Sequence, residues 1–263
     1  VRAADLHFGE LGYAQVARES YADFLALKRT GTIPAGCRLM IAIPSPYNVI
    51  SWNVAPDVRS VVEPAYEAAM SAEIQAIAQS VPAHELAIQW DCAHDMQAFE
   101  GARTPWFTPI REGIIERLAR FGDAVPAGVE LGYHFCFGTY GGRHFVEPKS
   151  ARAMVDLANG ITTQTKRSVE WIHMPVPIER DDDAYFAPLG DLRLRPDTLV
   201  YLGLIHDQDG AAGTAKRMAT ADRYLRDYGV ATECGFGRRD PESLAKLLDV
   251  HADVLRSVCA HCG

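Results

Sequence analysis

Short apolar runs alternate with longer segments of helical periodicity along this chain. Six runs read as buried parallel strands: Arg38 to Pro44, Glu85 to Asp91, Val129 to Phe137, Ser168 to Val176, Thr198 to His206 and Val230 to Gly235. Apolar residues recur at helical spacing in Tyr13 to Arg29, Val62 to Ser80, Pro109 to Arg120, Ser150 to Thr163, Thr214 to Asp227 and Pro241 to Val258. A shorter run, Ala4 to Gly9, is ambiguous. This alternation predicts an α/β fold on a parallel sheet.

The strand runs are almost continuously apolar, as in LAIQW, VYLGLI and RLMIAI. Such runs are typical of parallel strands covered by helices, so either a closed barrel or a doubly wound sheet is expected. Six strands are two short of an eight-stranded barrel, and we expect upstream sequence to supply the rest. No linker, repeat or low-complexity tract divides residues 1–263, which predicts a single domain.

Composition narrows the function classes. The net charge is −8 and no basic stripe occurs, which argues against nucleic acid and anionic membrane surfaces as partners. No apolar stretch reaches the roughly 18 to 20 residues that span a bilayer, and the first residues lack a signal-peptide pattern, so a cytoplasmic protein is expected. Six cysteines are too few and too scattered for a disulfide scaffold, which directs attention to thiolate chemistry.

Polar side chains occur at or near the C-terminal ends of five predicted strands. In a barrel of strands and helices, the loops after the strands build the functional site, so these residues are the candidates for chemistry. They are Asp91, His134 with Cys136, His173, His206 and Cys234.

His134 and Cys136 are two residues apart on one predicted strand, so both side chains point to the same face. Imidazole and thiolate are preferred zinc ligands, and a catalytic zinc site takes three protein ligands and leaves one position for substrate. Cys234, at the end of the last strand, can supply the third ligand. The alternative is a buried histidine with cysteines that act as small hydrophobic residues.

Five segments resemble cobalamin-independent methionine synthase, in the same order and over most of the chain. YHFCF resembles the zinc-binding strand of that family, and TECGFGRR resembles the segment that brings its second cysteine. IPSPYNVISW, IQWDCAHD and LIHDQDG resemble three further segments of its active site. The resemblance implies a (β/α)8 TIM barrel of the type shared with uroporphyrinogen decarboxylase, here without its first strands.

The resemblance also implies roles for individual residues. Trp52 corresponds to a tryptophan that meets the folate, Asp91 to an aspartate that holds the amino group of the acceptor, and His206 to a proton donor. The family's fourth zinc ligand is a glutamate on the strand after His-x-Cys, where this chain offers Glu170 and His173. The two residues face opposite sides of a strand, and His173, nearer the strand end, is the predicted ligand.

Together these features predict a zinc-dependent methyl or alkyl transferase that acts through a metal-activated thiolate on small-molecule substrates. A donor of the 5-methyltetrahydrofolate type is compatible with it, as is a homo-oligomer. The alternatives are a metal-dependent lyase or hydrolase acting on a small oxygenated substrate, and a catalytically inactive binding barrel. A bound metal would distinguish the two enzyme hypotheses from the inactive barrel. Dependence of the reaction on an added thiol would distinguish the transferase from the lyase or hydrolase.

Overall fold

The computed structural model describes residues 2, 5–140, 143–144, 146–237 and 239–260. The strands are β1 Leu39–Pro44, β2 Leu86–Cys92, β3 Glu130–Phe135, β4 Thr139–Tyr140, β5 Arg143–His144, β6 Trp171–Pro175, β7 Leu199–Ile205 and β8 Tyr228–Thr232. The helices are α1 Tyr13–Arg29, α2 Pro46–Asn53, α3 Arg59–Ser80, α4 Ala93–Phe99, α5 Ile110–Ala124, α6 Arg152–Gln164, α7 Asp183–Phe186, α8 Gly210–Ala221 and α9 Pro241–Ala260.

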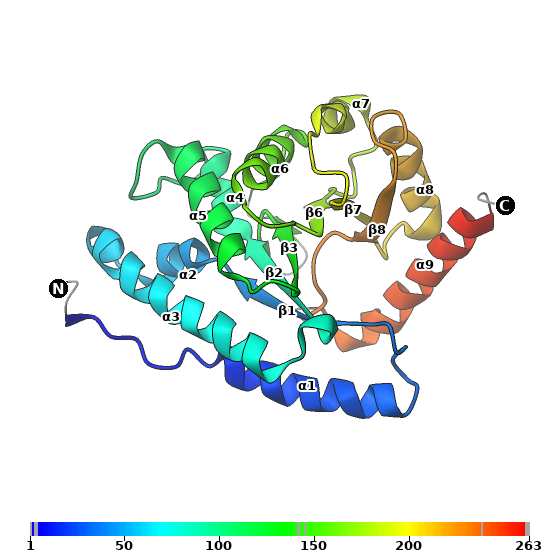
Figure 1. Cartoon of the computed structure of the whole chain (residues 1–263). Helices are drawn as coiled ribbons and strands as arrows, with labels where there is room; N and C mark the ends of the chain where they lie inside the picture. The colour runs from blue at the N-terminus through cyan, green and yellow to red at the C-terminus, as the bar shows by residue number, and fades with distance from the viewer. Residues whose placement is uncertain (1, 3–4, 141–142, 145, 238, 261–263) are drawn as a thin grey trace.

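A six-stranded parallel sheet forms the centre of the molecule, in the order β1-β2-β3-β6-β7-β8. All six strands predicted from the apolar runs are present. Helices alternate with the strands and surround the sheet (Figure 1). Within the described residues β1 and β8 are edge strands, so the fold is an incomplete TIM barrel.

One face of the sheet packs against the helices. Trp90 of β2 and Tyr133 of β3 are fully buried on this face. Their partners lie on α5: the Trp90 ring is 5.5 Å from that of Phe121, and the Tyr133 hydroxyl donates a 2.8 Å hydrogen bond to the Leu118 carbonyl. Successive side chains of a strand alternate between faces, so the residues between them face the inside of the partial barrel.

The inner face carries polar side chains in two layers. In the lower layer Trp171 of β6 donates its indole N–H to Gln89 of β2 at 3.1 Å, crossing the intervening strand β3. This crossing requires Gly132, because a Cβ at that position would lie 1.8 Å from the Trp171 ring. In the upper layer Asp91 and His134 are in register on β2 and β3, as are His134 and His173 on β3 and β6. Three predicted site residues thus form one row across the sheet.

Three short helices, α2, α4 and α7, were not predicted from the periodicity. α2 and α4 have 8 and 7 residues and follow β1 and β2 almost directly. Asn48 of α2 connects the two helices through hydrogen bonds. Its amide N–H donates to the Asp91 carbonyl at 2.6 Å, and its Oδ1 accepts the His94 N–H at 2.5 Å. This contact fixes the loops at the C-terminal ends of β1 and β2, on the side where the candidate site lies.

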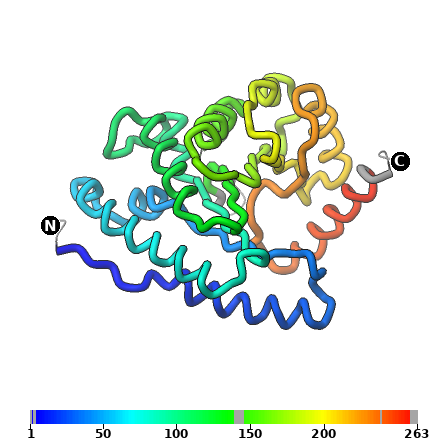
Figure 2. Tube along the Cα trace, in the orientation of Figure 1, coloured from blue at the N-terminus to red at the C-terminus, as the bar shows by residue number. Residues whose placement is uncertain are grey.

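The chain before α1 contains no strand in its described part. Ala4, the first residue of the ambiguous run, lies outside the described residues, and residues 6–10 are irregular. The segment before α1 and the C-terminal helix α9 lie at opposite ends of the molecule (Figure 2). No helix in the described part of the chain has the length and apolarity required to cross a membrane.

Candidate metal centre

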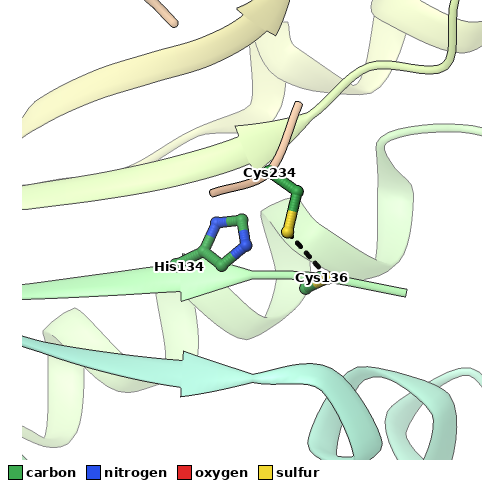
Figure 3. Close-up of side chains that lie close together, drawn as sticks. All are labelled: His134, Cys136 and Cys234. Carbon is green, nitrogen blue, oxygen red and sulfur yellow. Dashed lines mark hydrogen bonds between the residues drawn. The ribbon is translucent and has the colours of Figure 1, made fainter. Parts of the chain in front are cut away.

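His134, Cys136 and Cys234 converge at the C-terminal edge of the sheet. His134 is on β3, Cys136 follows that strand, and Cys234 follows β8. One potential ligand atom from each residue lies within 4.8 Å of the others. Figure 3 shows the imidazole of His134 and the sulfur of Cys234 facing one another, with Cys136 beside them. His134 and Cys136 are 5% and 7% exposed, so a bound ion would be shielded from water on most sides.

The spacing of the two sulfur atoms matches a shared metal ion. The Sγ atoms of Cys136 and Cys234 are 3.9 Å apart. Two thiolates on one tetrahedral zinc at the usual Zn–S length of about 2.3 Å lie about 3.8 Å apart, whereas a disulfide requires about 2.05 Å. The donor set also suits zinc, which prefers nitrogen and sulfur ligands. These residues therefore fit the metal that the sequence predicted.

Backbone contacts hold the two cysteines in place. Gly138 has a φ of 77°, a conformation that glycine adopts readily, and its N–H donates to Cys136 Sγ at 3.2 Å. An N–H directed at sulfur stabilises a thiolate. On the other strand, the Thr232 hydroxyl donates to the Cys234 carbonyl at 2.9 Å and fixes the turn after β8.

The pKa values of Cys136 and His134 depend on burial and on the neighbouring ionisable groups. The neighbouring Cys234 and burial raise the pKa of the Cys136 thiol well above its usual range. Burial opposes protonation of His134, but Cys234 and the carboxylates of Asp91 and Glu233 outweigh it, and the net pKa of His134 is raised. Without a metal the site therefore holds protons that a cation would have to displace.

His173 lies beside His134 and not in the group of three potential ligands. Its Nδ1 is 2.7 Å from Nδ1 of His134, and its Nε2 is 3.0 Å from the Thr232 carbonyl oxygen. The other residue considered for the fourth ligand, Glu170, accepts the Leu131 N–H at 2.6 Å near the start of β6, at the far end of the strand. His173 as a ligand stays a prediction, and its contacts suggest another role, argued below.

Asp91 lies next to His134 in the row across the sheet. Its Oδ1 accepts a 3.0 Å hydrogen bond from the Gln89 amide, and its backbone carbonyl accepts from Ser45 N–H at 3.1 Å. Asp91 is only partly buried. A carboxylate held in this way can orient a cationic group of a small molecule at the metal centre.

His206 follows β7 and is 4% exposed. Its Nε2 is 2.9 Å from the Val176 carbonyl oxygen, and its Nδ1 is 4.0 Å from a carboxylate oxygen of Glu233. Glu233 directly precedes Cys234 in the sequence, which places His206 close to the metal centre. Burial lowers the pKa of His206, and the Glu233 carboxylate opposes this effect without cancelling it.

Trp52 lies on α2 with 65% of its surface exposed. Its ring centre is 5.4 Å from that of His94 on α4, at an angle of 40°. Ser51, the preceding residue, is 2.7 Å from His94 Nδ1 through its hydroxyl, and its carbonyl accepts from Arg59 at 2.9 Å. The indole therefore stands on a fixed backbone and presents a flat apolar face to solvent.

Sequence reasoning missed three contributors to this site. The Gly138 N–H contacts Cys136, the Thr232 carbonyl contacts His173, and Glu233 approaches His206. Two of these groups belong to the backbone, whose position no side-chain pattern reveals. Glu233 could have been found, since an acidic residue directly precedes the predicted ligand Cys234.

Comparison with known proteins identifies the fold. No protein-family model and no curated protein matches the chain. Among solved structures, a crystal structure of a candidate vitamin-B12-independent methionine synthase from Listeria monocytogenes matches with a TM-score of 0.50 at 18% identity. The match covers 81% of this chain, which spans 63% of the length of that protein. The chain therefore has the barrel fold that the sequence resemblance predicted.

Proposed function

We propose that this protein is a zinc-dependent methyl or alkyl transferase that acts on a thiol acceptor. The observation that supports it most is the convergence of His134, Cys136 and Cys234, with sulfur atoms 3.9 Å apart, at the C-terminal edge of a partial barrel. Three protein ligands leave one position of a tetrahedral ion for substrate. Zinc in this site would deprotonate an acceptor thiol at neutral pH and supply a thiolate nucleophile.

Residues around the centre suit the two substrates. Asp91, beside His134 in the sheet, is our proposed contact for an amino group of the acceptor. The exposed indole of Trp52 offers a stacking face for a planar donor such as a reduced folate. A methyl group on a tertiary amine leaves readily only when that nitrogen is protonated. Our proposed proton donor is His206, whose Nδ1 is 4.0 Å from the carboxylate of Glu233, the residue before the ligand Cys234.

An assay with separated substrates tests this proposal. Protein reconstituted with one equivalent of zinc is incubated with 5-methyltetrahydrofolate and a panel of small thiols, and methylated thiol is measured. We expect product that requires both zinc and thiol. Turnover of a small oxygenated substrate without any thiol would instead indicate a lyase or hydrolase, and the absence of bound metal would indicate an inactive binding barrel.

Zinc affinity is expected to increase with pH. The pKa of the Cys136 thiol is raised well above its usual range and that of His134 is also raised, so both groups keep their protons to higher pH than free side chains do. Binding then releases protons, so that the dissociation constant decreases as pH rises until these groups have lost their protons. Calorimetric titration with zinc in buffers of different ionisation enthalpy measures the number released. A binding constant independent of pH between 6 and 8 would contradict this assignment.

Trp52→Ala is expected to weaken donor binding without loss of zinc. Aromatic stacking contributes about 0.5–1.5 kcal/mol beyond area burial, which corresponds to a KM for the donor roughly 2- to 13-fold higher. The control is Trp52→Phe, which retains an aromatic face and should retain most of the affinity for the donor. An unchanged KM in Trp52→Ala would show that the exposed indole has no part in binding the donor.

A further inference from the structure

His173 occupies the place next to His134 where a fourth ligand was expected. We propose that His173 is a positioning residue, an inference that rests on the proposed metal centre. It holds the His134 ring so that Nε2 faces the metal, and does not itself bind the ion. The three protein ligands are then His134, Cys136 and Cys234, and the fourth position is kept for substrate.

Hydrogen-bond donors and acceptors determine this arrangement. The Thr232 carbonyl can only accept, so Nε2 of His173, 3.0 Å away, must carry a hydrogen. In a neutral imidazole that carries its hydrogen on Nε2, Nδ1 has no hydrogen and is an acceptor. The neighbouring Nδ1 of His134, at 2.7 Å, must therefore be the donor. A chain of two hydrogen bonds thus runs from His134 through His173 to the backbone of β8.

The remaining nitrogen of His134 is the one available to a metal. Its Nε2 is buried and has no hydrogen-bond partner among the described residues, and Figure 3 shows it directed toward the sulfur of Cys234. An imidazole that binds a metal through one nitrogen commonly donates the other N–H to a neighbouring acceptor, which fixes the orientation of the ring. His173 is such an acceptor.

Distances argue against two imidazoles that bind one ion through their Nδ1 atoms. Two nitrogens on one tetrahedral zinc, at about 2.0–2.1 Å each, lie about 3.3 Å apart. The Nδ1 atoms of His134 and His173 are 2.7 Å apart, which is a hydrogen-bond distance. The sulfur atoms, by contrast, have the spacing of two ligands. The two sulfur atoms are therefore spaced as ligands of one ion, and the two Nδ1 atoms are spaced as the partners of a hydrogen bond.

The position of Thr232 gives this chain of hydrogen bonds a second effect. Thr232 ends β8, and its hydroxyl holds the carbonyl of Cys234. Through His173 the ring of His134 on β3 is thus connected to the segment that carries Cys234. The strands that supply the ligands, β3 and β8, are not neighbours in the sheet, and His173 on β6 bridges the distance between them.

The tautomers can be measured in the metal-free protein. Long-range proton–nitrogen NMR spectra of the full chain, with histidine signals assigned through single His variants, report which ring nitrogen carries hydrogen. We expect His173 to be protonated at Nε2 alone and His134 to be protonated at Nδ1. A hydrogen on Nδ1 of His173 would overturn the proposal. This experiment does not depend on zinc, so it separates failure of the proposal from failure of the proposed function.

Two variants test the consequence for metal binding. His173→Asn retains an acceptor near the Nδ1 position, whereas His173→Phe fills the volume without one. We expect His173→Phe to bind zinc about 10- to 100-fold more weakly, as is typical for loss of a partner of a ligating histidine, and His173→Asn to recover most of that loss. Glu170→Gln, directly before the same strand and remote from the site, is the matched control and should bind as the wild type does.

X-ray absorption of the zinc-loaded proteins counts the ligands. We expect one imidazole and two sulfur ligands in the wild type, and the same set in His173→Asn and in His173→Phe loaded at excess zinc. Two imidazoles in the wild type, with one lost in both variants, would overturn the proposal and establish His173 as the fourth ligand. Circular dichroism of each variant confirms that the fold is retained.

Discussion

Replacing Cys136 or Cys234 with serine is expected to leave the protein without stoichiometric zinc after dialysis. The two sulfur atoms, 3.9 Å apart, are the anionic part of the ligand set. Zinc binding by four protein ligands in small domains is worth about 10–16 kcal/mol, or about 2.5–4 kcal/mol for each ligand, so that loss of one thiolate lowers affinity by roughly 10²–10³-fold. Elemental analysis of purified, dialysed variants measures the effect.

Cys37 provides the matched control for this prediction, since it is a free, exposed cysteine. Cys37→Ser removes a thiol elsewhere in the chain, and its zinc content should equal that of the wild type. The same measurement with Cys92→Ser, at a fully buried position on β2, separates metal loss from general loss of packing. If Cys136→Ser and Cys234→Ser both retained one zinc per chain, the proposed centre would be wrong.

The strands could be predicted because parallel strands covered on one side by helices have a strong apolar signal. All six appear in the structure, since the buried face of each needs large apolar side chains such as Trp90 and Tyr133. The last strand begins earlier than predicted, at Tyr228. Its start follows Asp227, which has a φ of 56°. Gly229 is the second residue of the strand, so the apolar run begins inside the strand and not at its start.

Short helices at strand ends gave no usable signal. α2 and α4 are only 8 and 7 residues long, which is too short for helical periodicity to stand out. Their position depends on long-range hydrogen bonds of Asn48 to β2 and α4. No local pattern encodes contacts of this kind, although these helices carry Trp52 and His94 and follow the C-terminal ends of β1 and β2.

Sequence reasoning could place the metal ligands on one face but could not assign their hydrogen bonds. A spacing of two on a strand predicts that His134 and Cys136 point the same way, and they do lie together. Whether His173 binds a metal or a neighbouring ring depends on 2.7 Å and 3.0 Å contacts made with two other strands. These contacts follow from the register of β3, β6 and β8, which the order of residues along the chain does not reveal.

His206→Asn is expected to lower turnover by roughly 10²–10⁴-fold while the zinc content is unchanged, because proton transfer by a positioned side chain has that typical value. The asparagine is uncharged and cannot deliver a proton near neutral pH, yet it can still donate to the Val176 carbonyl that His206 contacts. Turnover, zinc content and melting temperature are measured on the same preparation. If His206 were a ligand, zinc would be lost with activity; if it were a packing residue, only the melting temperature would change.

The pH profile gives the sharper test of this assignment. Burial lowers the pKa of His206, and the Glu233 carboxylate, 4.0 Å from Nδ1, raises it in part. A proton donor with a lowered pKa is protonated only below that value, so log kcat of the wild type should fall by about one unit per pH unit above it. Glu233→Gln removes the opposing charge and should move this descending limb to lower pH, with slower turnover at pH 7. In His206→Asn the limb should disappear. A descending limb that persists unchanged in both variants would assign the proton donor to another group.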